Sequence, residues 1–365
     1  MTTSGNSQLT NAKRVKNDEF YTQLTDIEKE LKHYKKHFKG KTVFCNCDDP
    51  FESNFFKYFV LNFNNLGLKK LIATCYVTSP ISNRQLSLFD ILGEPEENKN
   101  KPYKAVVTKV YDTTGDGGID MVDVAALFKT GENCLAELRG NGDFRSEESL
   151  KLLAEADIVA TNPPFSLFRE YVSLLIERNK KFVIMGNKNS ITYKEFFPYL
   201  RDSLVWAGAT SLNGGRWMIM PKGTEVESAT AKVNEQGETI VNIPGVCWFT
   251  NLDIKKRHED LILVKKYNSD DYPKYSNYDA IEVSKVTDIP YDYAGVMGVP
   301  ITFMDKYNPD QFEIIGMAED NGRGFSGAES KWDGVNPHCV IKGKNKFKRL
   351  FIRNKHPETK KEEQL

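Results

Sequence analysis

The chain has 365 residues and a hydrophobic content of 40%, and its formal net charge is zero because 50 Lys and Arg balance 50 Asp and Glu. This length exceeds what one hydrophobic core usually organises, so two domains are expected. The sequence has no run of about eighteen apolar residues to span a bilayer, and its polar N-terminus has no signal-peptide core, so we expect a cytoplasmic protein with reduced cysteines.

The first predicted element is an amphipathic helix that follows a polar lead. Thr25 and Glu28 have the spacing of a capping box, which predicts that the helix begins there. Its apolar positions recur at helical spacing: Ile27, Leu31, Tyr34 and Phe38. Gly40 is expected to end the helix.

A first strand is predicted over residues 42–47, followed by a helix that begins near Ser53, and a second strand is predicted over residues 71–77. Cys45 and Cys47 would share one face of the first strand. Because no matching second pair occurs, they are interpreted as small buried side chains, and no metal site is expected.

Residues 80–130 are interpreted as an insertion. Within it, residues 112–123 reproduce much of the spacing of a calcium-binding loop, with oxygen-bearing side chains at positions 1, 3, 5, 9 and 12 and a glycine at position 6. The last position is Asp123 rather than a longer glutamate. Two interpretations stay open: a bound cation, or a turn held by Asp and Gly chemistry.

The next segment contains a short strand that ends in a proline-rich turn. Gly142-Asp143-Phe144-Arg145 precedes a helix that begins near Ser146. A buried strand, Ile158–Ala160, then leads to the turn Asn162-Pro163-Pro164-Phe165. In an open α/β sheet such a turn lies at the carboxyl edge, where ligands bind. Further alternation of strands and helices to residue 207 predicts a mostly parallel sheet with helices on both sides.

The residues of this turn suit chemistry on an exocyclic amine. The lone pair of such a nitrogen is delocalised into the ring of the base. Two hydrogen-bond acceptors that hold the amino hydrogens turn this lone pair out of the ring plane. The side-chain oxygen of Asn162 and the carbonyl of Pro163 are the expected pair, Pro163 and Pro164 restrict the backbone, and Phe165 offers a face on which a base stacks. Positioning and electrostatics then carry the rate without a general base. The simpler interpretation is a loop that ends a core strand.

After residue 208 the alternation breaks into shorter strands and longer loops, which is typical of a target-recognition region. Its basic residues predict contacts to phosphates or base edges: Arg216, Lys255, Lys256, Arg257 and Lys274. Residues 340–365 hold nine Lys or Arg and three Glu, a local charge of +6 (9 − 3). That excess permits a surface that faces DNA on a neutral chain, while residues from 358 onward suit a solvated tail.

Several motifs together resemble a known family. Asn162-Pro163-Pro164-Phe165 resembles the (Asn/Asp/Ser)-Pro-Pro-(Tyr/Phe) signature of S-adenosylmethionine-dependent amino methyltransferases. The surrounding blocks are similar to the EcoRI-type adenine-specific DNA methyltransferases: residues 18–23, 44–50, 53–59, 161–171, 272–275, 278–281 and 295–303. The resemblance therefore covers most of the chain.

The resemblance implies a Rossmann-like methyltransferase fold and a set of residues that bind S-adenosylmethionine. Phe20, Tyr21 and Thr22 match the motif that closes over the carboxylate end of the cofactor. The first turn after a strand has Asn46, Asp48 and Asp49 in place of the usual glycines. Asp143 and Phe144 match the motif that holds the adenine of the cofactor, and Tyr76 is expected to stack on it.

These predictions combine into a site-specific DNA adenine-N6 methyltransferase of a type II restriction-modification system, or a solitary methylase, that acts on a flipped-out adenine in double-stranded DNA. Residues 1–207 are expected to form the catalytic domain and residues 208–365 the recognition region, in a monomer or weak dimer. The alternatives are an RNA or protein-glutamine methyltransferase and a non-catalytic DNA-binding subunit. The recognised sequence is not legible, and GAATTC is the first site to test.

Overall fold

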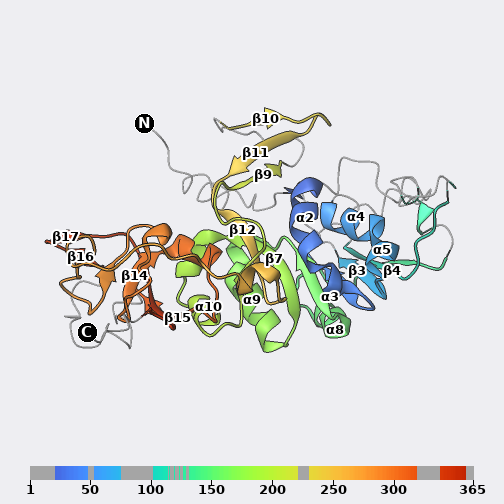
Figure 1. Ribbon diagram of the computed structural model, residues 1–365. Helices are drawn as coiled ribbons and strands as arrows, with labels where there is room; N and C mark the ends of the chain where they lie inside the picture. Colours follow the sequence, from blue (N-terminus) through green and yellow to red (C-terminus); the bar gives the residue numbers. More distant parts are fainter. Residues whose placement is uncertain are drawn as a thin grey trace. The chain divides into compact units, whose positions relative to one another are not determined.

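The computed structural model describes residues 21–47, 53–74, 102–113, 115, 119, 123, 126–128, 131–220, 230–318 and 338–358 (Figure 1). The chain divides into two compact units, the first made of residues 1–188 and 208–252 and the second of residues 189–207 and 253–365. The units interleave along the chain, because the segment 189–207 belongs to the second unit and the chain then returns to the first. The division of roles at residues 207 and 208 stays a prediction.

The first unit begins with helical segments: α2 (Leu24–Leu31), η1 (Lys32–Tyr34) and α3 (Lys35–Phe38). The four apolar residues expected on the inner face are fully buried, which confirms the helical spacing: Ile27, Leu31, Tyr34 and Phe38. Gly40 follows with a φ of +71°, a left-handed conformation that glycine adopts at low cost.

The start of α2 differs from the prediction. Gln23 is the N-cap and the helix begins at Leu24, so the capping box of Thr25 and Glu28 is wrong. The reason is tertiary: Gln23 Nε2 donates a hydrogen bond to the carbonyl oxygen of Trp217 at 2.7 Å. That contact fixes where the chain enters the helix.

Four parallel strands form the middle of the large sheet, in the order β3-β2-β6-β7. Their bounds are Lys70–Thr74 for β3, Thr42–Cys45 for β2, Ile158–Thr161 for β6 and Lys181–Asn187 for β7. All residues of β2 and β6 are buried, as expected of parallel strands covered on both faces.

Antiparallel strands flank these four. On one side lie β4 (Tyr103–Val107) and β5 (Cys134–Glu137), and on the other lies β12 (Val246–Thr250). The sheet is therefore mixed, which corrects the expectation of a mostly parallel sheet. β12 runs antiparallel to β7 and pairs Val246 with Asn187, and next to this pair the N–H of Lys188 donates to the carbonyl of Gly245 at 2.7 Å.

Helices join the parallel strands along the chain (Figure 1): α4 (Asn54–Leu61), α5 (Phe63–Leu66), α8 (Glu147–Glu155) and α9 (Phe168–Glu177). Two predicted helix starts are confirmed. The hydroxyl of Ser53 accepts from the N–H of Phe55, and that of Ser146 accepts from the N–H of Ser149. Each serine thus satisfies a backbone donor that the helix leaves open.

A second, four-stranded sheet of the first unit has the order β1-β9-β11-β10. The strands are β1 (Tyr21–Thr22), β9 (Arg216–Ile219), β11 (Thr239–Ile243) and β10 (Lys232–Val233). β1 pairs with β9, with Thr22 opposite Met218. Two segments almost 200 residues apart in sequence are thereby joined.

A buried carboxylate holds the chain where it re-enters the first unit. Glu30 of α2 is fully buried. Its carboxylate accepts from the N–H groups of Ala209 and Thr210 at 2.6 and 2.8 Å and from the hydroxyl of Tyr34 at 2.6 Å. Gly208 precedes these two residues, and a Cβ added there would lie 2.3 Å from Glu30 Oε1. Only glycine fits that approach.

The second unit contains α10 (Phe197–Arg201), β8 (Trp206–Ala207) and the 3-10 turns η5 (Lys255–His258), η6 (Val286–Asp288) and η7 (Ile301–Asp305). Its four-stranded sheet has the order β13-β14-β18-β15. The strands are β13 (Ile281–Glu282), β14 (Met297–Pro300), β18 (Arg349–Asn354) and β15 (Phe312–Met317). A separate hairpin consists of β16 (Val340–Ile341) and β17 (Lys344–Asn345). In the part of the chain that the structure describes, no helix is long and apolar enough to cross a membrane.

Candidate active site

The proline-rich turn follows β6 directly at the carboxyl end of the parallel strands. Pro163 is buried, while Asn162 and Phe165 are half-buried. The Oδ1 atom of Asn162 is itself buried. Pro164 leads into the 3-10 turn η3 (Phe165–Leu167), whose last N–H donates to the Pro164 carbonyl at 3.0 Å. The turn therefore has a fixed course that holds one amide and one ring at this edge of the sheet.

Hydrogen bonds tie this turn to the end of β2. The hydroxyl of Thr161, one residue before Asn162, donates to the main-chain carbonyl of Asn46. The hydroxyl of Tyr171 in α9 donates to Asn46 Oδ1. Asn46 and Tyr171 are both buried. The structure thus brings together the first predicted cofactor turn and the predicted catalytic turn.

Tyr171 also contacts the next predicted motif. The ring of Phe144 is buried and packs edge-on against Tyr171, with ring centroids 5.1 Å apart and an interplanar angle of 80°. Tyr171 is not among the predicted site residues. Its position between Asn46 and Phe144 is visible only in three dimensions, because the three residues are far apart along the chain.

Asp143 lies beside Phe144 and is held by a charged partner. Arg145 donates to its carboxylate from Nε at 2.9 Å and from Nη2 at 2.7 Å, and Arg145 Nη1 also meets Glu170 at 2.8 Å. The hydrogen bonds from Arg145 lower the pKa of Asp143 below its ordinary value. Asp143 therefore stays ionised near neutral pH and acts as a hydrogen-bond acceptor.

The N-terminal motif lies at the start of α4. The carbonyl of Thr22 accepts from Asn54 Nδ2 at 2.8 Å, and the Thr22 hydroxyl contacts Met185 Sδ of β7 at 2.8 Å. Tyr21 belongs to the same strand, β1. Four other predicted cofactor residues lie outside the described residues: Phe20, Asp48, Asp49 and Tyr76.

Thr74 adds a polar group that the sequence prediction did not select. It ends β3, and β3 lies next to β2 in the sheet. Its side chain is 1% exposed, and its hydroxyl makes no hydrogen bond with any residue that the structure describes. A buried hydroxyl normally has a hydrogen-bond partner, so the hydroxyl of Thr74 can form a hydrogen bond with a molecule that binds at the carboxyl edge. The available signal was its place as the last residue of a parallel strand.

The five predicted DNA contacts have different surroundings. Arg216 opens β9 in the first unit and folds back onto its own loop, with Nη2 donating to Thr210 Oγ1 at 2.7 Å and to the Ser211 carbonyl at 3.0 Å. Lys255 and Lys274 are exposed in the second unit. These two lysines suit phosphate contacts without rearrangement.

The other two candidates have partners in the second unit. Lys256 forms an ion pair with Asp305 at 2.7 Å, and the side chains are only 22% and 11% exposed. Arg257 stacks on the ring of Trp206 at 3.7 Å from its centroid, and burial lowers the pKa of its guanidinium. Both side chains therefore contribute to packing where they stand, and their role toward DNA stays a prediction.

The loop with calcium-like spacing is only partly described. Asp123 is 1% exposed, and its Oδ1 accepts from both the N–H and the hydroxyl of Thr113 at 2.6 and 2.5 Å. Asp112 Oδ1 accepts from the N–H of Gly115 at 2.6 Å. These bonds are those of a turn held by its own carboxylates. Cys47 lies beyond the end of β2 with a φ of +70°, so it does not share a strand face with Cys45 as expected.

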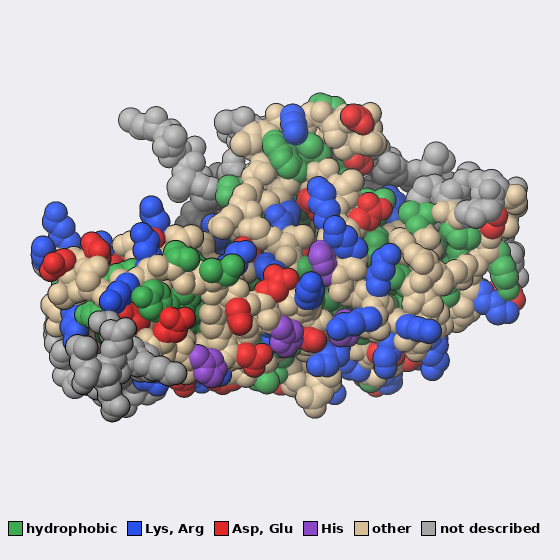
Figure 2. Space-filling model, in the orientation of Figure 1, with side chains coloured by type: hydrophobic (Ala, Val, Ile, Leu, Met, Phe, Trp, Pro, Cys, Tyr) green, Lys and Arg blue, Asp and Glu red, His purple; other side chains and the backbone are tan. Residues whose placement is uncertain are grey.

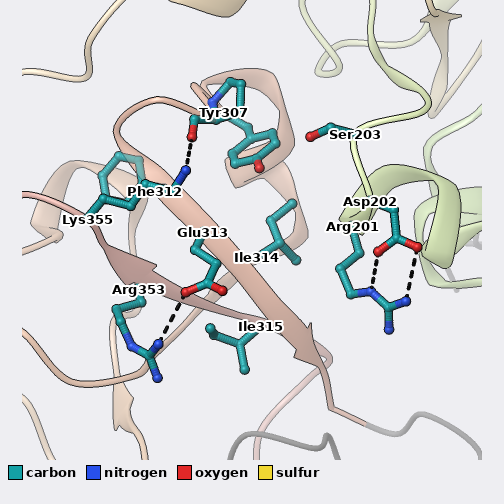
Figure 3. Close-up of a pocket in the computed structure, with 11 residues that line it drawn as sticks. Arg201, Asp202, Ser203, Tyr307, Phe312, Glu313, Ile314, Ile315, Arg353 and Lys355 are labelled. Carbon is teal, nitrogen blue, oxygen red and sulfur yellow. Dashed lines mark hydrogen bonds and ion pairs between the residues drawn. The ribbon is translucent and has the colours of Figure 1, made fainter.

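A hollow in the second unit is lined by paired charges (Figure 3). Arg201 pairs with Asp202 at 2.7 Å, and Arg353 pairs with Glu313 at 3.2 Å. Lys355 Nζ donates to the carbonyl of Pro309 at 2.6 Å. Because its cations are already compensated, this hollow is a weaker candidate for a site than the carboxyl edge of the large sheet.

An α/β sheet with an Asn-Pro-Pro-Phe turn at the carboxyl end of a central parallel strand defines the class: an enzyme that methylates an amino group. Comparisons with known proteins give the family. The family model described as "Adenine-specific methyltransferase EcoRI" matches residues 8–355. The chain belongs to this family.

Named relatives agree with that assignment. The chain is 45% identical to the type II methyltransferase M.EcoRI of Escherichia coli, over 96% of this chain and 97% of the relative. It is 36% identical to the type II methyltransferase M.MpnI of Mycoplasma pneumoniae, over 83% of each chain. No solved structure matches the chain.

Proposed function

We propose that this chain transfers a methyl group from S-adenosylmethionine to the N6 amino group of an adenine within a specific sequence of duplex DNA. It would serve as the modification enzyme of a type II restriction-modification system or as a solitary methylase. The observation that carries the proposal is the Asn162–Phe165 turn at the carboxyl end of β6, linked through Thr161 to Asn46. Membership of an adenine-specific family supports the choice of base.

The turn would act by positioning. Asn162 Oδ1 and the carbonyl of Pro163 accept the two amino hydrogens, which turns the nitrogen lone pair out of the ring. Phe165 is half-buried and offers its face to the base. The amino proton leaves to water after transfer, so the site works without a general base. Pro163 and Pro164 limit backbone motion during this alignment.

The residues along the same edge suit the cofactor. The buried hydroxyl of Thr74 has a hydrogen bond to offer, Asp143 is an ionised acceptor beside the ring of Phe144, and Asn46 retains the N–H donors of its amide. S-adenosylmethionine supplies an electron-poor methyl group on sulfur when bound. We propose that these residues bind it together with Phe20, Tyr21 and Thr22, with Asp48 and Asp49, and with Tyr76, in a Rossmann-like methyltransferase domain.

The adenine amino group is paired inside a duplex, so the nucleotide must rotate out of the stack to reach Phe165. We propose that residues 1–207 carry catalysis and that residues 208–365 recognise the target. Lys255 and Lys274 would meet phosphates as they stand, whereas Lys256 and Arg257 would first release their present partners.

Substitution of Asn162 tests this proposal. Asn162→Ala is expected to bind S-adenosylmethionine like the wild type and to lose at least about a hundredfold in methyl transfer, since one positioned polar group contributes roughly that much. Asn65→Ala, which changes an exposed asparagine of α5 away from the turn, is the control and should keep wild-type activity. Label from radioactive S-adenosylmethionine is measured in a GAATTC duplex, in a transcript of the same sequence and in protein glutamine.

Each alternative predicts its own result in this assay. Label in the transcript or in protein, with none in the duplex, supports the RNA or glutamine methyltransferase. DNA binding with no labelled product identifies a non-catalytic subunit. Wild-type turnover by Asn162→Ala contradicts the assigned role of the turn. Base-resolution mapping of methylated adenines in cells that express the protein then gives the recognised sequence.

A further inference from the structure

The β16–β17 hairpin of the second unit carries a lysine at its tip in an unusual backbone conformation. Ile341 pairs with Lys344, which leaves Lys342 and Gly343 as the two residues of the turn. Both have positive φ, +48° for Lys342 and +74° for Gly343, as in type I′ hairpin turns. Asn, Asp or Gly normally occupies the first of these positions, because a Cβ lies too close to the following carbonyl oxygen in the left-handed conformation and only Gly, or a short polar side chain that bonds locally, tolerates it well.

That lysine therefore has a conformational cost of roughly 1 kcal/mol. Asparagine or glycine at position 342 would make the same turn without it. A residue kept in a strained conformation points to a role outside the fold of the turn itself. Among the described residues, a Cβ added at Gly343 would meet nothing within 4 Å, and Lys342 and Gly343 are both exposed.

The base of the hairpin is firmly attached. Ser276 N–H donates to the carbonyl of Val340 at 2.9 Å, and Asn277 Oδ1 accepts from the N–H of Val340 at 3.1 Å. The N–H of Lys346 donates to the carbonyl of Cys339 at 2.7 Å. Ile341 packs on the buried core cluster that contains Cys339. The tip is thus presented from a fixed support.

The charges of this segment are of one sign. Residues 338–357 contain no Asp or Glu and seven Lys or Arg: 342, 344, 346, 348, 349, 353 and 355. Arg349 pairs with buried Glu282 at 2.7 Å, and Arg353 pairs with Glu313. The side chains of Lys342, Lys344 and Lys346 form no ion pair with any residue between 21 and 358 that the structure describes.

The space-filling view shows basic side chains at this hairpin and acidic side chains from neighbouring segments (Figure 2). Figure 2 shows blue side chains that stand out from the surface where Figure 1 places β16 and β17, with carboxylates beside them. Lys342 and Lys344 are exposed, and Lys346 is half-buried. Three lysines within five residues, on a stiff projection, suit a polyanion with closely spaced charges.

We propose that the β16–β17 hairpin binds the sugar-phosphate backbone of duplex DNA through Lys342, Lys344 and Lys346. This assignment rests on the proposed function, and it narrows the basic surface expected over residues 340–365 to three lysines of one hairpin. Lysine acts toward phosphate as a point charge and carries little sequence information. The hairpin would therefore fix the orientation of the duplex, and other residues would read its bases.

The test is the salt dependence of DNA binding by the full chain. Each lysine–phosphate contact contributes about −0.9 to the slope of log K against log salt. The triple variant K342Q/K344Q/K346Q is expected to lose about 2.7 units of slope, so that the rise in Kd between 50 and 200 mM salt becomes about 40-fold smaller than in the wild type. S-adenosylmethionine affinity should stay unchanged.

Three exposed lysines of the same unit provide the matched control: K265Q/K266Q/K285Q removes equal charge elsewhere and should keep the wild-type slope. Lys342→Gly distinguishes a lost DNA contact from a folding defect, because glycine relieves the strained turn. The unfolding temperature of this variant should equal or exceed that of the wild type, while the slope of log K against log salt becomes shallower by about 0.9. Lys342→Arg retains the positive charge and should keep the wild-type slope.

The outcomes separate the two proposals. A triple variant whose slope lies within about one unit of the wild-type slope overturns the hairpin assignment, even when the wild type methylates DNA normally. An equal loss of slope in the control triple also overturns it, because charge anywhere on the unit would then suffice. A wild-type protein that labels no DNA contradicts the proposed function itself.

Discussion

Replacement of Tyr171 by phenylalanine tests whether the network at the carboxyl edge serves the cofactor. Phenylalanine keeps the ring that packs against Phe144 and removes only the hydroxyl that donates to Asn46 Oδ1. Because Asn46 is 2% exposed, its oxygen would lose a donor that water cannot replace. An unsatisfied buried acceptor costs about 1–3 kcal/mol, and the free energy of unfolding should fall by about that amount.

The same change should weaken cofactor binding. The hydrogen bond fixes the side chain of Asn46 and hence the direction of its amide donors. If the loss of this fixed orientation weakens the binding free energy by about 1.4 kcal/mol, Kd for S-adenosylmethionine rises about tenfold. Urea unfolding measures the first effect, and calorimetric titration with S-adenosylmethionine measures the second.

Tyr272→Phe is the matched control. Tyr272 is also buried, and its hydroxyl donates to the carbonyl of Asp288 at 2.8 Å in the second unit. It should lower stability comparably and leave Kd for S-adenosylmethionine unchanged. If Tyr171→Phe loses stability but binds the cofactor like the wild type, Asn46 has only a structural role and our reasoning about the site is refuted.

Two further predictions concern charged groups away from the proline-rich turn. Glu30→Gln should destabilise the protein by about 2–4 kcal/mol, because hydrogen bonds to a charged acceptor contribute roughly 1.5–3 kcal/mol each and the amide places a donor against an N–H group. Tyr34→Phe should lower the free energy of unfolding by less. Equal decreases for the two variants in urea unfolding would contradict this reasoning. The hydrogen bond to Asp253 at 2.6 Å raises the pKa of His258 above its ordinary value. The His258–Asp253 pair therefore contributes its full stability below about pH 6.5, and this contribution is lost as pH rises through the raised pKa. Asp253→Asn should lower that pKa in an NMR titration, and an unchanged titration curve would show that the ion pair is absent in solution.

Local patterns were sufficient for several features. The spacing of Ile27, Leu31, Tyr34 and Phe38 predicted a buried helical face, and serines 53 and 146 predicted two helix starts, because periodicity and capping depend on neighbours in the chain. The order of strand, turn and helix around Asn162 and the blocks shared with a family of adenine-specific methyltransferases were also legible in the sequence. Family membership is now confirmed by the match over residues 8–355.

Long-range contacts decided the rest. The side chain of Gln23, the N-cap residue of α2, donates to the Trp217 carbonyl of β9, and β12 makes the large sheet mixed by pairing antiparallel with β7. Tyr171 became part of the candidate site only when folding placed its hydroxyl on Asn46, 125 residues away. Such contacts join residues whose separation in sequence carries no periodic signal. The motif blocks shared with a known family therefore determined the class of protein, and the tertiary structure decided which side chains meet.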